Sequence, residues 1–237
     1  MRKSIIPLLL ITSIALAGCN SDNNNNNNAT AASCAGTAVN PQRLYLQQLG
    51  PHSVIIKWRG NQNGGAEADN VCFGTDMEKL LQESQTTATV TATGHSEALL
   101  SGLQADTTYY YSVGGAAVAD AAHSFRTAPA PGELPGDSNT RIWIVGDSGT
   151  AGKGSPAAGQ VRDGFETFVK NHGNEPADLF LMLGDNAYNQ GTDIEHQKAV
   201  FDVYTKLLAT TPVWPTIGNH EMGSLGVLMS ISPNGYA

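Results

Sequence analysis

The sequence is poor in positive charge. Lys and Arg number 13 among 237 residues, against 21 Asp and Glu, so the net charge is −8. Apart from Arg2-Lys3, no basic cluster stands out. Because nucleic-acid binding needs a concentrated positive field, no nucleic-acid partner is expected. An acidic chain also has no broad field that would draw in anionic substrates, so any such affinity must come from a local site.

The apolar stretch Ile5–Ala15 is too short to span a bilayer comfortably, and it follows the charged pair Arg2-Lys3. It ends in Leu16-Ala17-Gly18-Cys19, which resembles a bacterial lipobox. The resemblance implies that residues 1–18 are a signal peptide and that Cys19 carries lipid. The protein would then be anchored to a membrane of the bacterial cell envelope, facing the periplasm or the exterior. An ordinary secretory signal followed by a chance Cys is the other interpretation.

Cysteine is scarce, with three residues at positions 19, 34 and 72. If Cys19 carries lipid, an even pair remains in an oxidising compartment. We therefore expect a disulfide between Cys34 and Cys72. Two unpaired thiols are the alternative, because sequence alone does not supply the geometry.

The region after the signal peptide changes from low complexity to strand-like alternation. Residues 19–38 include an unbroken Asn run at positions 23–28 and predict a flexible tether. From residue 39 to 127, short segments alternate apolar and polar positions. In one of them Val54, Ile56 and Trp58 would share one face of a sheet. This spacing predicts a domain of short β-strands.

The run Leu100–Val113 resembles the corner of a fibronectin type III sandwich, with Tyr109 as the corner tyrosine. Tyr111 and Val113 would point into the core. Residues 39–127 are therefore predicted to form a fibronectin type III-like β-sandwich. Its aromatic residues are expected to pack in the core rather than bind a ligand.

A second domain is expected after the Pro- and Gly-rich linker at residues 128–139. Strand-like apolar runs there alternate with helical periodicity at residues 157–172 and 193–210. Strands that alternate with helices indicate parallel strands with crossover helices. Residues 140–237 are therefore predicted to belong to an α/β domain.

Three apolar segments of this region each run into a Gly followed by a residue with a ligand oxygen. The motifs are Gly146-Asp147-Ser148-Gly149, Gly184-Asp185-Asn186-Ala187-Tyr188 and Gly218-Asn219-His220-Glu221. Because open α/β sheets bind ligands beyond the carboxyl ends of their strands, these residues are expected to meet at one edge. Carboxylates and a phenol suit a hard, highly charged metal ion. One such motif could be an ordinary turn, but three in order are hard to obtain by chance.

These motifs resemble the first three sequence blocks of the purple acid phosphatases, which are calcineurin-like metallophosphoesterases. The Tyr of the second block is typical of the purple acid phosphatase branch. The resemblance runs from about Ala38 to Glu221, and it implies that residues 140–237 are the first half of a calcineurin-like domain. It also implies a phosphomonoester substrate and a dinuclear metal centre that activates a hydroxide. The metals would be Fe(III) and a second divalent ion, Fe, Zn or Mn.

The resemblance assigns metal-binding roles to individual residues. Asp147 would bind the first metal and Asp185 would bridge both. Tyr188 would ligate Fe(III), and Asn219 would bind the second metal through its amide oxygen. The alternatives are that Asp147 and Asn219 cap turns and that Tyr188 is a core aromatic.

The resemblance also gives His220 a catalytic role facing the phosphate or leaving group, with Glu221 orienting it. It departs after Glu221, because the family has three further histidines in V-x-x-H and G-H-x-H blocks. Residues 222–237 contain no His. We therefore expect a catalytic domain that is truncated after the third block. Residues 39–127 should fold alone, whereas residues 140–237 should be only marginally stable.

Two other functions are considered. A serine esterase would use Ser148 as nucleophile with Gly184 and Asn186 as oxyanion residues, but it also needs a late D-x-x-H, which is absent. It leaves Tyr188 and His220 unexplained as well. A non-enzymatic surface lipoprotein, with a binding sandwich domain and a degenerate catalytic half, is the alternative to the hydrolase.

Overall fold

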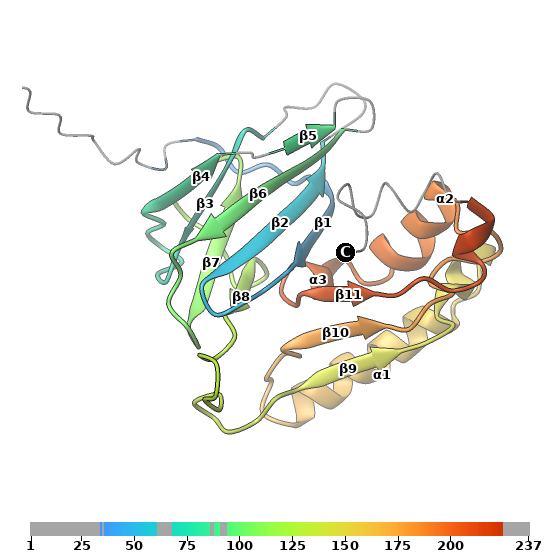
Figure 1. The fold of residues 1–237 in the computed structure, drawn as a ribbon. Coiled ribbons are helices and arrows are strands. Elements are labelled where there is room, and N and C mark those ends of the chain that lie inside the picture. The colour runs from blue at the N-terminus through green and yellow to red at the C-terminus, as the bar shows by residue number, and fades with distance from the viewer. Residues whose placement is uncertain (1–33, 35, 61–67, 86–87, 91–93, 225–237) are drawn as a thin grey trace, which may run out of the picture. The chain divides into compact units, whose positions relative to one another are not determined.

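The computed structural model describes residues 34, 36–60, 68–85, 88–90 and 94–224. The predicted signal peptide and Cys19 lie outside the described residues. Within the described part, no helix is long and apolar enough to cross a membrane. The chain forms a β-rich part followed by an α/β part (Figure 1).

The β-rich part is a sandwich of two antiparallel four-stranded sheets, ordered β1-β2-β6-β5 and β4-β3-β7-β8. The strands are β1 (Gln42–Gln47), β2 (Ser53–Arg59), β3 (Asn70–Gly74), β4 (Gln82–Gln85), β5 (Ala88–Val90), β6 (His95–Ser101), β7 (Thr108–Val113) and β8 (Ser124–Arg126). The predicted β-sandwich is thus confirmed. Side chains from both sheets form one buried cluster, which is the core of this part.

The predicted alternation places the expected side chains in that core. Val54, Ile56 and Trp58 are at most 1% exposed, because every second residue of a strand points to the same face. The Tyr109 hydroxyl accepts a hydrogen bond from the backbone N–H of Gln104 at 2.9 Å. Tyr111 is fully buried.

Two strands of the sandwich, β4 and β6, were not predicted from the sequence. β6 pairs with β2 along its whole length, from Ser53 opposite Ser101 to Arg59 opposite His95. Its buried positions include Ser96 and Ala98. These residues are small or polar, so the alternation that marks a strand is weak in the sequence.

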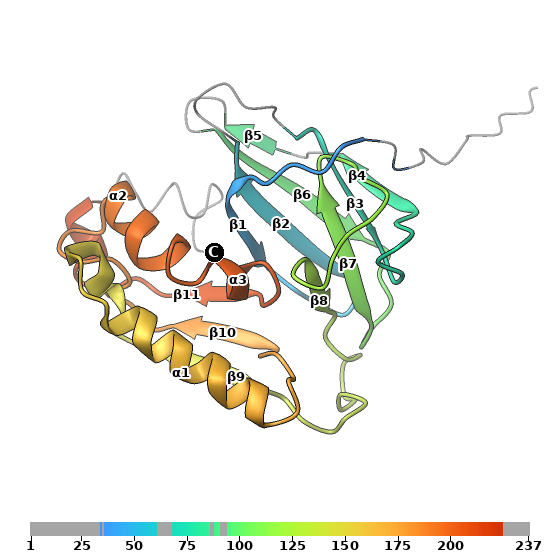
Figure 2. The same ribbon diagram turned by 180° about the vertical axis from the view of Figure 1, so that it is seen from behind.

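The α/β part contains a parallel three-stranded sheet in the order β11-β10-β9. The strands are β9 (Ile142–Val145), β10 (Leu179–Met182) and β11 (Val213–Pro215). The helices are α1 (Ala157–Asn171), α2 (Asp193–His196) and α3 (Thr205–Leu208), with 3-10 turns at Gly149–Lys153 and Glu221–Ser224. Figure 2 shows α1 running along β9 and β10. The parallel strands and crossover helix agree with the predicted fold class.

The helix expected at residues 193–210 is interrupted. Between α2 and α3 lies a π-helical segment, Gln197–Phe201, in which the N–H of Asp202 donates to the carbonyl of Gln197. The wider turn changes the direction of the side chains that follow. Phe201, at the end of this segment, and Leu208 of α3 are buried in one cluster with the sheet.

The two faces of this sheet differ sharply. One face carries Phe180 and Met182, which are at most 1% exposed. α1 contributes Phe165, whose ring stacks on Trp143 with centroids 4.2 Å apart. On the opposite face, Ile144 is 53% and Trp214 is 47% exposed. Within the described residues, only one face of the sheet is therefore covered.

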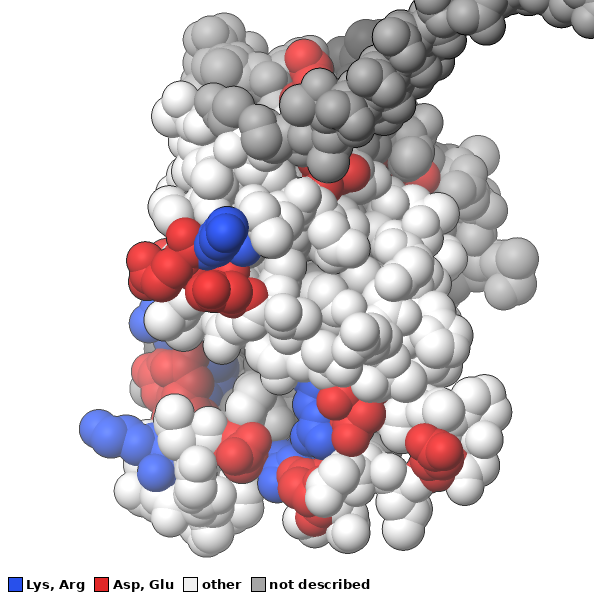
Figure 3. Space-filling model, turned by 90° about the vertical axis from the view of Figure 1, so that its left-hand side faces the viewer, with Lys and Arg blue, Asp and Glu red and all other residues white. Residues whose placement is uncertain are grey.

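The surface charge agrees with the composition. On the face drawn in Figure 3, most described residues are neutral, and Lys and Arg lie beside Asp and Glu. No continuous basic patch forms among the residues described on this face.

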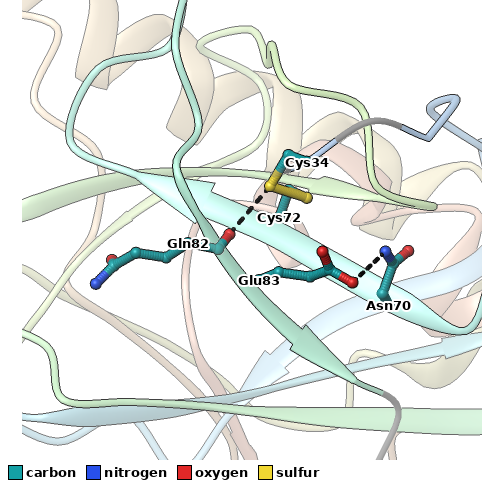
Figure 4. The surroundings of a disulfide bond; sticks show 5 residues. All are labelled: Cys34, Asn70, Cys72, Gln82 and Glu83. Atoms are coloured by element: carbon teal, nitrogen blue, oxygen red, sulfur yellow. Dashed lines mark hydrogen bonds between the residues drawn. A yellow bond between two sulfur atoms is a disulfide. The ribbon is translucent and has the colours of Figure 1, made fainter. Parts of the chain in front are cut away.

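Cys34 and Cys72 form a disulfide with a Cα–Cα distance of 5.9 Å (Figure 4). The sulfur of Cys34 lies 3.2 Å from the carbonyl oxygen of Gln82. Close by, the amide nitrogen of Asn70 donates to Glu83 at 2.8 Å. The disulfide ties the start of the described chain to β3, with both sulfurs in a buried cluster.

Candidate metal centre

The first two motifs lie side by side at the carboxyl ends of β9 and β10. The strands pair in register, with Val145 opposite Met182, and Asp147 and Asp185 follow them. Both Asp residues have left-handed backbones, with φ of 52° and 51°, a conformation that Asp tolerates better than most residues. The loops are tied by a hydrogen bond from the N–H of Asp147 to the carbonyl of Gly184 at 3.2 Å. The sheet therefore brings both carboxylates to one edge.

Tyr188 returns to the same point. Its hydroxyl donates to Asp147 Oδ1 at 2.9 Å and lies 3.4 Å from Asp185 Oδ2. Desolvation, aided by the hydrogen bond to Asp147 and the negative charges of both carboxylates, raises the pKa of Tyr188 to about 12. Three oxygen atoms from two loops thus converge, and the phenol is protonated near neutral pH.

Close backbone approach at the third loop requires glycine. A Cβ atom added at Gly218 would overlap the carboxylate and the backbone nitrogen of Asp185. This packing lets the backbone N–H of His220 donate to Asp185 Oδ1 at 3.0 Å. The third motif is therefore held against the second, and it brings Asn219, whose side chain is exposed, to the same side of the sheet.

The imidazole of His220 is oriented by the loop after Tyr188. Its Nδ1 lies 2.6 Å from the carbonyl oxygen of Asn189. Because a carbonyl only accepts, Nδ1 carries the proton and Nε2 holds the free lone pair in the neutral ring. The ring also meets Tyr188 edge-on, with centroids 4.4 Å apart.

Glu221 does not have the role assigned to it from the sequence. Its carboxylate is buried and accepts hydrogen bonds from four backbone N–H groups, those of Asp185, Asn186, Ala187 and Gly218, at 2.6–3.0 Å. No described hydrogen bond joins it to the imidazole of His220, whose Nδ1 is bound by Asn189 instead. A buried carboxylate is stabilised by several N–H donors. Glu221 therefore fixes the second and third loops to each other rather than orienting His220.

Other motif residues have local roles. The side-chain amide of Asn186 donates to the carbonyl of Thr216 at 2.8 Å, which adds a further tie between the loops. Lys153 was missed by the sequence analysis, and its Nζ lies 4.5 Å from the centroid of the Tyr188 ring. No motif marks it, because its closeness to Tyr188 arises from the 3-10 turn after the first loop.

The converging groups fit a hard metal ion. Asp147, Asp185 and Tyr188 offer carboxylate and phenol oxygens, which suit iron and similar hard ions. Among the described residues, the one group of three His, Cys, Asp or Glu side chains close enough to share an ion is Cys34, Cys72 and Glu83. Its two sulfurs form the disulfide, so they do not serve as thiolate ligands. The candidate metal centre is therefore the edge of the sheet where Asp147, Asp185 and Tyr188 converge.

Two protein-family models match the chain, one in the β-rich part and one in the α/β part. Residues 41–127 match the family model "Purple acid Phosphatase, N-terminal domain", and residues 140–235 match "Calcineurin-like phosphoesterase". No curated protein matches the chain.

Among solved structures, the chain is similar to "Structure of PhoD", at 17% identity and a TM-score of 0.49. The match covers 76% of this chain and 39% of that one. A weaker similarity is to "Structure of the Siderophore Interacting Protein from Acinetbacter baumannii", at 11% identity and a TM-score of 0.20, covering 84% of this chain and 75% of that one. The chain spans only 39% of the length of the PhoD structure.

Proposed function

Because this chain belongs to the calcineurin-like metallophosphoesterases, with a purple acid phosphatase N-terminal domain before the phosphoesterase domain, we propose that it hydrolyses phosphate monoesters in the manner of purple acid phosphatases. The observation that carries the proposal is the convergence of Asp147 and Asp185 on the Tyr188 hydroxyl. A phenol in this place is the feature that separates a purple acid phosphatase site from a general phosphoesterase site.

Asp147, Asp185, Tyr188 and Asn219 are the residues that would hold the metal pair. When bound, the ions, Fe(III) and a divalent Fe, Zn or Mn, would supply Lewis acidity and lower the pKa of a water molecule. Tyr188 must lose its proton to serve as a ligand, and its hydrogen bond to Asp147 shows where that proton lies beforehand.

His220 is the group suited to the leaving oxygen. Its Nδ1–H is bound to Asn189, so Nε2 is the nitrogen that exchanges a proton with substrate. In the imidazolium form Nε2–H can donate to the oxygen of the departing alcohol, which is general acid catalysis. Tyr188 holds the ring edge-on and limits its rotation.

The test is to load the purified protein with iron and record its visible spectrum and its hydrolysis of p-nitrophenyl phosphate. We expect bound iron, a broad charge-transfer band and metal-dependent hydrolysis. Tyr188→Phe should remove the band, whereas Tyr110→Phe, a matched change in the sandwich, should keep it. Asp185→Asn should reduce hydrolysis to the level of metal-free protein.

Absence of bound iron and of hydrolysis would contradict the proposal. It would favour the alternative, a non-enzymatic surface lipoprotein whose sandwich domain binds a partner. A band that survives Tyr188→Phe would contradict the assigned ligand while leaving the hydrolase class intact.

We also propose that the protein is a lipoprotein of the bacterial envelope, anchored through Cys19. The support is the lipobox-like sequence at residues 16–19. Cys19→Ser should move the protein from the detergent phase to the aqueous phase of a phase-partition experiment. Equal partition of both proteins would contradict the anchor.

A further inference from the structure

Arg43, in the sandwich strand β1, has an unusual backbone. Its φ is 50°, and it lies within a register shift between Gln42 and Tyr45 in the pairing with β2. Such bulges change the direction in which a side chain points. Non-glycine residues persist in the left-handed region where their surroundings hold them there, and such positions gather at functional sites. The partners of Arg43 are therefore informative.

Those partners lie on α2 and the π-helical segment of the α/β part. The guanidinium of Arg43 donates to Asp193 Oδ1 at 2.5 Å, to the Asp193 carbonyl at 3.0 Å and to Gln197 Oε1 at 2.7 Å. Its side chain is 1% exposed. Arg59, at the end of β2, donates to Asp193 Oδ2 at 3.4 Å and to Gln197 Oε1 at 3.0 Å. Two sandwich arginines thus hold the first turn of α2.

The same helical turn holds the loop after Tyr188. The carboxylate of Glu195 accepts from the backbone N–H groups of Asn189, Gln190 and Thr192 at 2.6, 3.1 and 2.9 Å. Asp193 and Glu195 are two residues apart on this short helix. Asp193 binds the sandwich arginines, and Glu195 binds the loop. Any movement of α2 therefore moves the loop.

The loop in turn holds the imidazole of His220 through the carbonyl of Asn189. We propose that Arg43 and Arg59 are positioning residues for the metal centre, acting through Asp193, Glu195 and Asn189 on His220. The sandwich would then be a working part of the site rather than a separate module. The effect of these residues on catalysis rests on the proposed function, whereas the chain of contacts from Arg43 to the loop is independent of it.

This chain of contacts is expected to be stiff because the guanidinium of Arg43 is buried, although its partner Asp193 is 47% exposed. Removing the Asp193 carboxylate would leave a buried guanidinium without its charged partner. The guanidinium of Arg43 also lies over the Phe201 ring, 4.8 Å from its centroid, which adds a cation–π contact. The sandwich therefore has little freedom to shift against α2 without breaking these contacts.

The experiment is amide hydrogen exchange, followed by NMR, at Asn189, Gln190 and Thr192. Arg43→Met keeps the length of the side chain but removes the charge and the donors. We expect it to speed exchange at these amides by about tenfold or more. The loss of a charge-assisted hydrogen bond that holds α2 should make local opening of the loop more frequent by about that factor. Glu195→Gln, which alters the direct acceptor, should speed exchange at the same amides and serves as the positive control.

Tyr111→Phe is the matched control. It removes the bond from the Tyr111 hydroxyl to the carbonyl of Ala209 at 2.7 Å, a contact between the same two parts that lies outside the link. Exchange at the three amides should stay within about twofold of the original protein. If Arg43→Met does not fold, Asp193→Asn breaks the same link from the half-exposed side.

A second measurement reports on His220 itself. The ring nitrogens of the original protein should show the Nδ1–H tautomer by 15N chemical shift, and Arg43→Met should give a mixture of tautomers. Unchanged exchange in both Arg43→Met and Asp193→Asn, or equal acceleration in Tyr111→Phe, would overturn the proposal. Neither result depends on metal loading or hydrolysis, so failure of the proposed enzyme activity would be seen separately.

Discussion

The sandwich and the α/β part are held together in different ways. In the sandwich, side chains from both sheets meet in a closed core, where Trp58 is 1% and Leu100 is 0% exposed. In the α/β part, one sheet face packs on helices while the other leaves Ile144 and Trp214 about half exposed in the described residues. Apolar burial is the main source of folding free energy. The sandwich therefore has a core enclosed between two sheets, whereas the α/β part has an apolar cluster on one sheet face, which includes Tyr45 of β1, and relies in addition on polar ties.

Those polar ties are concentrated where the site is. Glu221 binds four backbone N–H groups, and Glu195 binds three more in the loop after Tyr188. Hydrogen bonds to a buried charged group contribute more than neutral ones. The site geometry is therefore set by two carboxylates acting on loop backbone, the buried Glu221 and the partly buried Glu195, with packing in a supporting role.

The largest expected effect is in the sandwich core. Trp58→Ala removes a fully buried indole and should lower the free energy of unfolding of the sandwich by about 3–5 kcal/mol. Urea unfolding followed by NMR signals of the sandwich will measure it. A loss below 1 kcal/mol would contradict a closed core at this position.

The next effect is in the loops of the α/β part. Glu221→Gln keeps the size of the side chain but weakens its bonds to the four amides, and should cost about 2 kcal/mol in that part. Glu166→Gln on exposed α1 is the control and should stay within about 0.5 kcal/mol. Equal effects of the two changes would show that Glu221 is not a structural tie.

Much of the architecture was predictable from the sequence. Periodicity predicted most of the sandwich strands and α1, because burial repeats every two or 3.6 residues. It failed at β6, where Ser96 and Ala98 occupy core positions, and across residues 193–210, where a π-helical segment changes the period. Neither feature has a local signal in composition.

The sequence predicted which residues form the candidate site better than it predicted the contacts between them. The three motifs identified Asp147, Asp185 and Tyr188 as neighbours, since strand ends of a parallel sheet meet at one edge. The role of Glu221 and the presence of Lys153 depend on how loops fold back over each other. Such contacts join residues far apart in the chain, as in the hydrogen bond from the backbone N–H of Asn186 to the carboxylate of Glu221, and spacing alone does not reveal them.

A smaller effect should appear as the pH falls. Burial and the nearby charges of Arg43 and Arg59 lower the pKa of His95 to about 4, and burial lowers the pKa of His196. In the unfolded chain both ionise near pH 6.5. Below that pH the unfolded state binds protons that the folded state does not, so stability should be full above pH 6.5 and fall toward pH 4.

Urea unfolding at pH 7.5 and at pH 5 will measure this loss, with separate probes in each part. His95→Gln should reduce the loss seen in the sandwich, and His196→Gln the loss seen in the α/β part. Stability that rises between pH 6.5 and 5 would show that the two rings are charged in the folded protein.

The smallest expected effect is on the open face of the α/β sheet. Trp214→Ala removes the same side chain as Trp58→Ala, but Trp214 is 47% exposed, so much less apolar area is lost from the interior. We expect the free energy of unfolding to fall by no more than about 1 kcal/mol. A loss as large as that of Trp58→Ala would mean that this face is covered in solution. The pair of tryptophan substitutions therefore measures directly how far the α/β part differs from the sandwich.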